Sequence, residues 1–254
     1  NRPIAAPVIG DISSSISALH ACLAKNNVTS SPSWLNALDA HKQINAEKMH
    51  EKLYAKTSPL NYYNALRVIR DVLDKHRDVM LVNEGANTLD DARNVINMYQ
   101  PRKRLDCGTW GVMGIGMGYA IGAAITSQLP VVAIEGDSAF GFSGMEIETI
   151  CRYQLPVTII IFNNGGIYRG DGINLSGGPD PSPTNLMAHA RYEKLMDAFG
   201  GSGYYAETEE DIQQALDTCL ASGKPGIINV NIDPAAGTES GHITNLNPKK
   251  VTGN

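Results

Sequence analysis

An aspartate and an asparagine each stand just after a stretch that is expected to form a buried strand. Asp137 follows the uncharged, β-branched run at residues 131–134 across a Glu-Gly turn, and Asn164 follows a second run at residues 157–162. Such runs are typical of parallel strands that are buried on both faces. Ligands bind at the carboxyl ends of parallel strands, and carboxylate and carboxamide oxygens suit Mg²⁺ or Ca²⁺ rather than zinc. We therefore expect a divalent cation at this edge of the sheet.

Glycines flank both polar residues. Gly136 precedes the aspartate, and Gly165 and Gly166 follow the asparagine. Because glycine has no side chain, its backbone N–H group can approach a phosphate closely. The residues alone therefore predict a site for a metal ion and a diphosphate group. A strand-end aspartate is otherwise often a helix cap, and that role is the alternative.

The same residues resemble a known family. Gly136-Asp137-Ser138, with Asn164 placed 27 positions after the aspartate (164 − 137), is similar to the diphosphate-binding signature of thiamine-diphosphate enzymes. The stretches GDSAFGFSGMEIETICRY and NNGGIYRG resemble the oxalyl-CoA decarboxylases, with the 2-hydroxyacyl-CoA lyases as near relatives. The resemblance extends from residues 3–7 to residues 235–242. Ser138 departs from the glycine that is commoner in the signature, but it keeps the backbone N–H and adds a hydroxyl group.

The resemblance implies an enzyme that uses thiamine diphosphate and Mg²⁺ to convert oxalyl-CoA to formyl-CoA and carbon dioxide. A 2-hydroxyacyl-CoA lyase, which cleaves a carbon–carbon bond with the same cofactor, is the alternative. The family's activating glutamate belongs to a separate pyrimidine-binding domain, and these 254 residues contain no convincing counterpart. We therefore expect the C-terminal part of a longer enzyme, inactive alone, which forms a homodimer or homotetramer.

Matching the family's motifs residue by residue implies roles for the residues around the two strand ends. Asp137 and Asn164 are expected to bind the metal ion with their side chains, and Gly166 with its carbonyl oxygen. Ser138 and Ala139 are expected to donate N–H groups to the diphosphate near a helix N-terminus.

A second group of residues is expected to hold the organic part of the cofactor. By the same match, Met113 props the cofactor into its bent shape, and the carbonyl group of Gly111 receives the aminopyrimidine. A gap-filling core residue is the alternative for Met113. The remaining positions that match cofactor contacts are Ala86, Asn87, Thr88, Val112, Ile167 and Tyr168.

Two residues are candidates for catalysis, Tyr168 and Ser240. Tyr168 follows the metal loop, where it contacts phosphate, closes over the site, or is a buried tyrosine bonded to the backbone. An arginine suits a phosphate well, although an exposed helical arginine is usually only solvated. The candidates for binding the acyl-CoA substrate are Arg93, Asn94, Glu239, Ser240 and Gly241.

Composition narrows the possible partners. A net charge of −5 and 43% hydrophobic residues describe a globular protein and offer no electrostatic basis for binding nucleic acid or an anionic membrane. Residues 110–134 carry no charge over a length that could span a bilayer. Glycines, Gln128 and Pro130 interrupt that run, so we expect a core helix and a buried strand instead. The four scattered cysteines fit free thiols in a reducing compartment, so we expect a cytoplasmic protein.

Strands and helices are expected to alternate, which predicts a doubly wound α/β fold with a parallel sheet and helices on both faces. Residues 85–88 and 171–183 are expected to be loops. In the glycine-rich helix, Gly114, Gly118 and Gly122 recur at every fourth position and predict close packing of that face. We expect strands at residues 79–84, 104–106, 131–134, 157–162, 203–206 and 226–232, and helices at residues 62–73, 89–98, 108–126, 146–152, 190–199 and 209–222.

The chain is expected to have four parts. Residues 1–25, which turn helical after Asp11, resemble the end of the family's middle domain. Residues 26–57 are expected to be a linker helix, residues 58–232 the domain that binds diphosphate and metal, and residues 233–254 a tail. From another functional class, a non-catalytic nucleotide-binding module is the alternative. The sequence argues against a nucleotide-binding module of the dinucleotide type. Such modules have a G-x-G-x-x-G motif between a strand and a helix and an acidic residue about twenty positions later, and no such motif is found.

Overall fold

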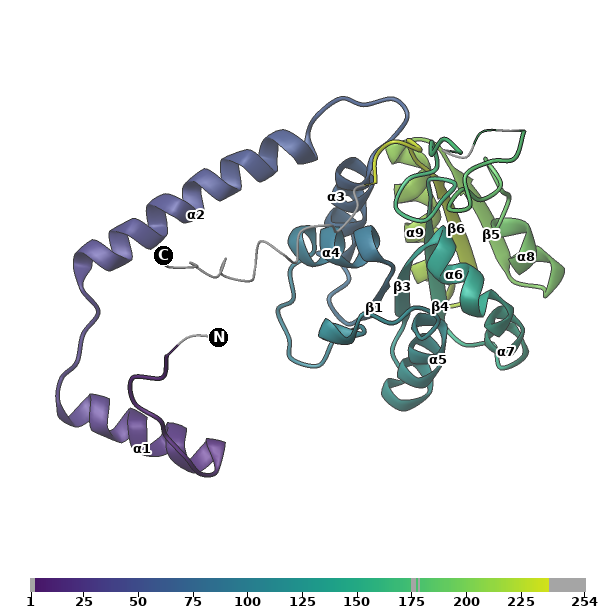
Figure 1. Cartoon of the computed structure of the whole chain (residues 1–254). Coiled ribbons are helices and arrows are strands. Elements are labelled where there is room, and N and C mark those ends of the chain that lie inside the picture. Colours follow the sequence, from purple (N-terminus) through teal and green to yellow (C-terminus); the bar gives the residue numbers. More distant parts are fainter. Residues whose placement is uncertain (1–2, 175–176, 178, 238–254) are drawn as a thin grey trace. The chain divides into compact units, whose positions relative to one another are not determined.

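The computed structural model describes residues 3–174, 177 and 179–237. The chain forms two compact units, Asn1–Glu51 and Lys52–Asn254 (Figure 1). The second unit contains the sheet and nearly all of the predicted site residues.

The first unit is helical. Helix α1 (Ile12–Lys25) begins where the side chain of Asp11 accepts a hydrogen bond from the N–H of Ser14 at 2.8 Å, as an N-cap residue does. The helix predicted after Asp11 is therefore confirmed. Helix α2 covers Pro32–Leu53. No residue of α1 is buried, so its apolar stripe, which includes Ile16, is exposed. The origin of this unit in a preceding domain stays a prediction.

The second unit is built on one parallel sheet of six strands, which confirms the predicted fold class. The strand order is β2-β1-β3-β4-β6-β5. Pairing of the central strands places Glu84 beside Glu135, and Gly136 beside Phe162. Every residue of β1, β3 and β4 is buried, as the β-branched composition of β3 and β4 predicts for those two strands. The strands are β1 (Met80–Glu84), β2 (Arg104–Leu105), β3 (Val131–Gly136), β4 (Val157–Asn163), β5 (Ser202–Ala206) and β6 (Gly226–Asn231).

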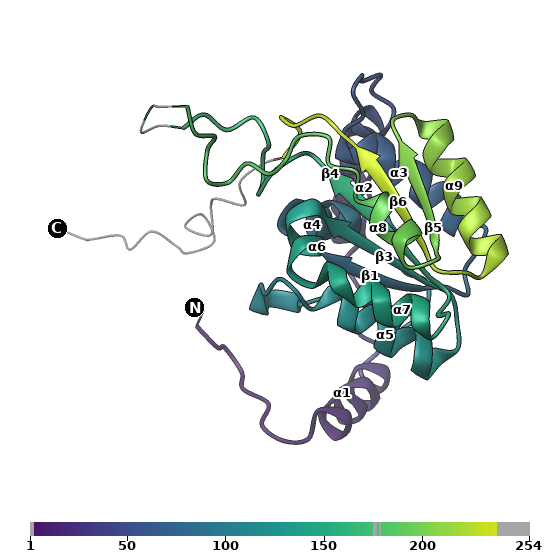
Figure 2. The ribbon, with the colours of Figure 1, turned by 90° about the vertical axis from the view of Figure 1, so that its right-hand side faces the viewer.

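Helices cover both faces of the sheet. Figure 2 shows α3 and α9 on one face and α5 and α7 on the other. Right-handed crossovers produce this division, because the connections that run along the strand order in opposite directions lie on opposite faces. One face carries α3 (Tyr62–Leu73), α4 (Ala86–Val95) and α9 (Glu209–Ser222); the other carries α5 (Gly116–Ser127), α6 (Asp137–Ser143), α7 (Ile147–Arg152) and α8 (Glu193–Ala198), with the short 3₁₀ turns η1 (Gly108–Trp110) and η2 (Gly144–Glu146) beside them.

The helix predicted at residues 89–98 ends early, at Val95, and the one predicted at residues 190–199 begins at Glu193. Two further predicted boundaries are wrong at glycines. Residues 86–88 form the first turn of α4 rather than a loop, because Gly85, with φ of 99°, turns the chain from strand to helix within one residue. The glycine-rich helix starts at Gly116 instead of residue 108. Gly111 and Gly114 have φ values of 71° and 95°, which a right-handed helix does not accept. Both segments therefore approach the strand ends as tight turns.

The close packing predicted for three glycines holds for only one of them. A Cβ atom on Gly114 would lie 3.2 Å from the Cβ atom of Phe142, whereas on Gly118 or Gly122 it would meet nothing within 4 Å. The last two glycines are exposed, and Ile125 of the same helix is exposed as well. Helix α5 therefore presents a smooth, partly apolar strip outward.

Helix α5 lies within the uncharged run at residues 110–134, which is long enough to span a bilayer. It has 12 residues and is followed by β3, as the interrupted apolar run predicts. No helix among the described residues combines the length and the apolar character needed to cross a bilayer.

The capping box of α9 gives a test of local stability. Thr208 accepts a hydrogen bond from the N–H of Asp211 at 3.1 Å, and the carboxylate of Asp211 accepts one from the N–H of Thr208 at 3.0 Å. We expect Asp211→Ala to lower the free energy of unfolding by about 1 kcal/mol, because it removes the carboxylate that accepts from the N–H groups of Thr208 and Glu207. Glu210→Ala is the matched control, since it removes the same charge from the same turn and is expected to cost only about 0.3 kcal/mol. Equal losses in urea denaturation would contradict the capping role.

Candidate functional site

The predicted metal residues meet at the carboxyl ends of β3 and β4. Asp137 opens α6 immediately after β3, and its side chain is almost completely buried. Its carboxylate accepts hydrogen bonds from the N–H groups of Gly165 at 2.8 Å and Gly166 at 3.2 Å. The loop after β4 is therefore tied to the residue after β3.

Asn164 is held in one orientation beside this contact. It is buried, and its side-chain N–H₂ group donates to the carbonyl oxygen of Tyr168 at 2.7 Å. The bond uses the nitrogen of the amide and leaves the carbonyl oxygen for another partner. Because Gly165 bonds to Asp137 and follows Asn164 in the chain, both predicted side chains lie at the same edge of the sheet.

Burial dominates the electrostatics of the aspartate. It raises the pKa of Asp137 to about 6, although the N–H groups of Ser138, Gly165 and Gly166 oppose the shift. A buried carboxylate and a carboxamide oxygen at one edge of the sheet are hard oxygen donors of the kind that Mg²⁺ binds. The residues present therefore fit a hard divalent cation.

A cleft with about 380 Å³ of empty space opens beside Asp137. Gly85 and Gly136 form its floor, where a Cβ atom on Gly136 would lie 3.1 Å from the hydroxyl oxygen of Thr88. Backbone therefore takes the place of side chains at the point where a phosphate is expected. The cleft brings together most of the predicted cofactor residues, namely Ala86, Asn87, Thr88, Met113, Asp137, Ser138, Gly166, Ile167 and Tyr168.

A second hollow with about 750 Å³ of empty space continues from the cleft. Gly85, Ala86, Met113 and Tyr168 line both spaces, and Gly111 and Val112 line only the second. Met113 therefore stands between the two spaces, and the segment before α5 forms part of their wall.

The two residues predicted to donate N–H groups to the diphosphate, Ser138 and Ala139, are placed differently. The N–H of Ser138 donates to the carboxylate of Asp137 at 2.7 Å. Ala139 is completely buried and does not line either hollow. The donation of both N–H groups to a diphosphate therefore stays a prediction.

Tyr168 lies at the site and connects two of its segments through its backbone. It lines both hollows, and its φ of 63° is a left-handed value that is uncommon outside glycine. Its carbonyl oxygen accepts hydrogen bonds from the side chains of Asn164 at 2.7 Å and Asn87 at 3.3 Å. The backbone of Tyr168 thus links α4 to the loop after β4.

The predicted substrate residues are only partly placed at the site. Arg93 lines the second hollow, but its guanidinium group is paired with Asp106 through bonds of 2.6 and 3.0 Å. Asn94 is exposed and lines neither hollow. The other predicted substrate residues, Glu239, Ser240 and Gly241, lie outside the described residues.

Two buried glutamates at the site were missed from the sequence. Glu84 ends β1, and its carboxylate accepts hydrogen bonds from the backbone N–H groups of Gly114, Ile115 and Gly116. Glu135, its neighbour on β3, receives no hydrogen bond from an N–H group of the described residues. Burial and the adjacent Glu84 raise the pKa of Glu135 well above its usual range. Their signal in the sequence was a glutamate followed by a glycine where each strand ends, Glu84-Gly85 and Glu135-Gly136.

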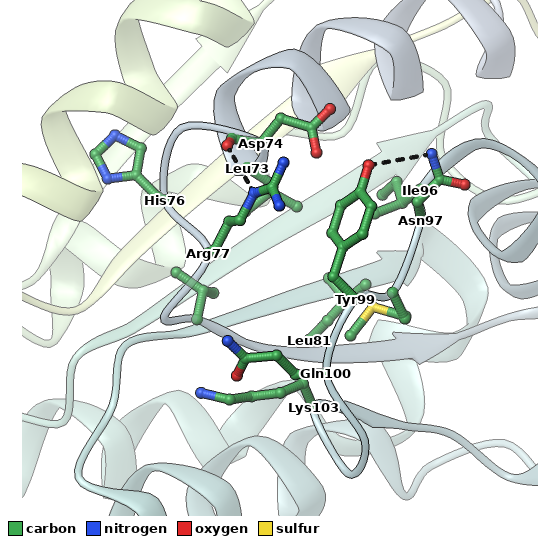
Figure 3. Close-up of a pocket in the computed structure, with 12 residues that line it drawn as sticks. Leu73, Asp74, His76, Arg77, Leu81, Ile96, Asn97, Tyr99, Gln100 and Lys103 are labelled. Carbon is green, nitrogen blue, oxygen red and sulfur yellow. Dashed lines mark hydrogen bonds between the residues drawn. The ribbon is translucent and has the colours of Figure 1, made fainter.

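Another hollow lies at the opposite, amino ends of β1 and β2 (Figure 3). There the guanidinium group of Arg77 lies over the ring of Tyr99 at 4.2 Å. Lys103 is 3.8 Å from the carboxylate of Asp78. None of the predicted site residues that the structure describes lines this hollow, so it is separate from the candidate site.

Comparison with known proteins agrees with the geometry. The family described as thiamine pyrophosphate enzyme, C-terminal TPP binding domain, matches residues 85–230. Oxalyl-CoA decarboxylase of Escherichia coli K12 is 69% identical over 254 residues, which are 100% of this chain and 45% of the relative. The 2-hydroxyacyl-CoA lyase of Arabidopsis thaliana is 45% identical over 94% of this chain and 42% of the relative. The chain therefore spans less than half the length of these curated relatives.

A solved structure supports the fold. Benzoylformate decarboxylase from Polynucleobacter necessarius matches 70% of this chain and 34% of its own, with a TM-score of 0.60 and 22% identity. Together with the family match over residues 85–230, this architecture leads to one assignment. The chain belongs to the thiamine pyrophosphate enzymes and carries their C-terminal TPP-binding domain.

Proposed function

We propose that the chain is the part of an oxalyl-CoA decarboxylase that binds the metal ion and the diphosphate, in an enzyme that forms formyl-CoA and carbon dioxide. One observation carries the proposal: Gly165 and Gly166 tie the loop that contains Asn164 to the carboxylate of Asp137. The identity of 69% with a decarboxylase, against 45% with a 2-hydroxyacyl-CoA lyase, supports the choice of substrate.

Several residues in and beside the cleft have roles in this proposal; Asn164 lies beside the cleft and lines a neighbouring hollow. The side chains of Asp137 and Asn164 and the carbonyl oxygen of Gly166 hold Mg²⁺, which neutralises the diphosphate. When bound, thiamine diphosphate supplies the electron sink for the decarboxylation. Met113 supports the cofactor from the wall shared by the two hollows, and Tyr168 closes the cleft on the other side.

The second hollow is the proposed entry for the substrate. It opens past Met113 toward Arg93, whose pairing with Asp106 fixes a cation at its margin. An acyl-CoA thioester carries phosphates at the far end of a long chain, and a fixed guanidinium group suits a phosphate. Tyr168 lines the hollow and is the proposed catalytic contact within the described residues.

The complete enzyme needs further parts in this proposal. The relatives extend well beyond this chain, and the pyrimidine-binding domain with its glutamate is proposed to lie in that remainder. The outward strip of α5, with Gly118 and Gly122, is the proposed contact of a homodimer or homotetramer, because small residues let helices approach closely. The four cysteines are free thiols, which supports a cytoplasmic location.

Metal ligation can be tested by calorimetry on the complete protein. We expect Asp137→Ala and Asn164→Ala to weaken the binding of Mg²⁺ with thiamine diphosphate by about a hundredfold, since loss of a supporting residue alone costs up to that factor. Asp171→Asn is the control, because its carboxylate is exposed and pairs with Arg169. Unchanged affinity in both site variants, or binding of NAD with Mg²⁺ instead, would refute the proposed site.

The pKa of Asp137 predicts a pH dependence of stability without metal. Burial raises the pKa from 3.8 in the unfolded chain to about 6 in the fold, so its protonated form favours folding. This contribution is complete below about pH 4 and is lost as the pH rises through about 6. We expect Asp137→Asn to remove that loss in urea denaturation, and Mg²⁺ with thiamine diphosphate to offset it in the wild type. A metal-free wild type whose stability follows the Asp137→Asn curve would contradict this.

The substrate can be tested with two thioesters. We expect the complete enzyme with thiamine diphosphate and Mg²⁺ to release formyl-CoA from oxalyl-CoA. Chromatography of the CoA products measures this release. A 2-hydroxyacyl-CoA is offered in parallel. Cleavage of the 2-hydroxyacyl-CoA without release of formyl-CoA from oxalyl-CoA would refute the decarboxylase activity and favour that of a lyase.

A further inference from the structure

Glu84 binds three consecutive backbone N–H groups in front of α5. One oxygen of its carboxylate accepts from Gly114 and from Ile115 at 3.3 Å, and the other accepts from Gly116 at 2.5 Å. The side chain is 1% exposed, so water does not compete for these bonds. A carboxylate at this end of a 12-residue helix also faces the positive end of the helix dipole.

The neighbouring Glu135 lacks such contacts. It lies beside Glu84 in the sheet and is completely buried, but no N–H group of the described residues bonds to its oxygens. Both carboxyl groups lie beneath Gly116, where a Cβ atom would collide with each of them. Of the two glutamates, therefore, only Glu84 holds the backbone of the segment.

The bond to Gly114 fixes a peptide group that belongs to Met113. The N–H of Gly114 and the carbonyl group of Met113 share one planar unit, so binding the first sets the orientation of the second. Gly114 has φ of 95° and no room for a side chain beside Phe142. The turn therefore has no side chain of its own at this position, and Glu84 supplies the anchor from β1.

We propose that Glu84 is a positioning residue, whose carboxylate fixes the turn at residues 114–116 and thereby holds Met113 in the wall of the cofactor cleft. The role of Met113 in this inference rests on the proposed function. Glu84 itself lines neither hollow, so it acts through the backbone and does not touch the cofactor.

Hydrogen exchange followed by mass spectrometry tests this on the complete protein. We expect the amides of residues 114–116 to be protected in the wild type, and Glu84→Gln to speed their exchange by about tenfold or more, because the carboxamide replaces one acceptor oxygen by a donor. Exchange in β4 is expected to stay unchanged. Unprotected amides at 114–116 in the wild type would overturn the proposal even if the variant fails to fold.

A matched control separates positioning from a general effect of the buried pair. Glu135→Gln alters the adjacent, equally buried glutamate and is expected to leave exchange at residues 114–116 within about twofold, since none of their N–H groups bonds to Glu135. Equal acceleration in both variants would overturn the proposal.

Cofactor binding provides the second measurement. Calorimetry with thiamine diphosphate and Mg²⁺ is expected to show about tenfold weaker binding in Glu84→Gln and in Met113→Ala, while only Glu84→Gln changes the exchange at residues 114–116. Full affinity in Glu84→Gln despite faster exchange would overturn the link to the cleft. If the wild type does not bind thiamine diphosphate, the proposed function fails, whereas the exchange result still decides whether Glu84 anchors the turn.

Discussion

The contact between Asp137 and the N–H groups of Gly165 and Gly166 is the constraint on which the site depends. It joins the residue after β3 to the loop after β4, with distances of 2.8 and 3.2 Å. These bonds compensate part of the cost of burying a carboxylate, but burial still raises its pKa to about 6. Burial therefore disfavours the charged form of Asp137, and a cation bound beside its carboxylate would stabilise that charge.

The same edge of the sheet carries a second buried acidic contact with a different purpose. Glu84 ends β1 and binds the backbone in front of α5, whereas Asp137 binds the loop after β4. Parallel strands deliver both carboxylates to one edge because all their carboxyl ends point the same way. Two neighbouring loops are thus fixed by side chains at the carboxyl ends of β1 and β3, and the cleft lies between them.

Much of this could be predicted from the sequence because it depends on local composition. The β-branched runs at β3 and β4 predict buried parallel strands, and the positions of Asp137 and Asn164 directly after these strands predict that both lie at the same edge of the sheet. The start of α5 could not be predicted, since Glu84 holds it from 30 positions before Gly114. The pairing of Glu84 with Glu135 depends on the register of β1 and β3, which no local pattern encodes. Arg93 likewise pairs with Asp106, 13 residues along the chain.

The most direct test of the account is the position of the metal. Crystals of the complete protein grown with Mn²⁺ and thiamine diphosphate would reveal the ion by its anomalous scattering. We predict one peak at the carboxyl ends of β3 and β4, about 2.0–2.3 Å from a carboxylate oxygen of Asp137 and from the side-chain oxygen of Asn164. A peak on the Glu84 and Glu135 pair, with none at Asp137, would contradict the account.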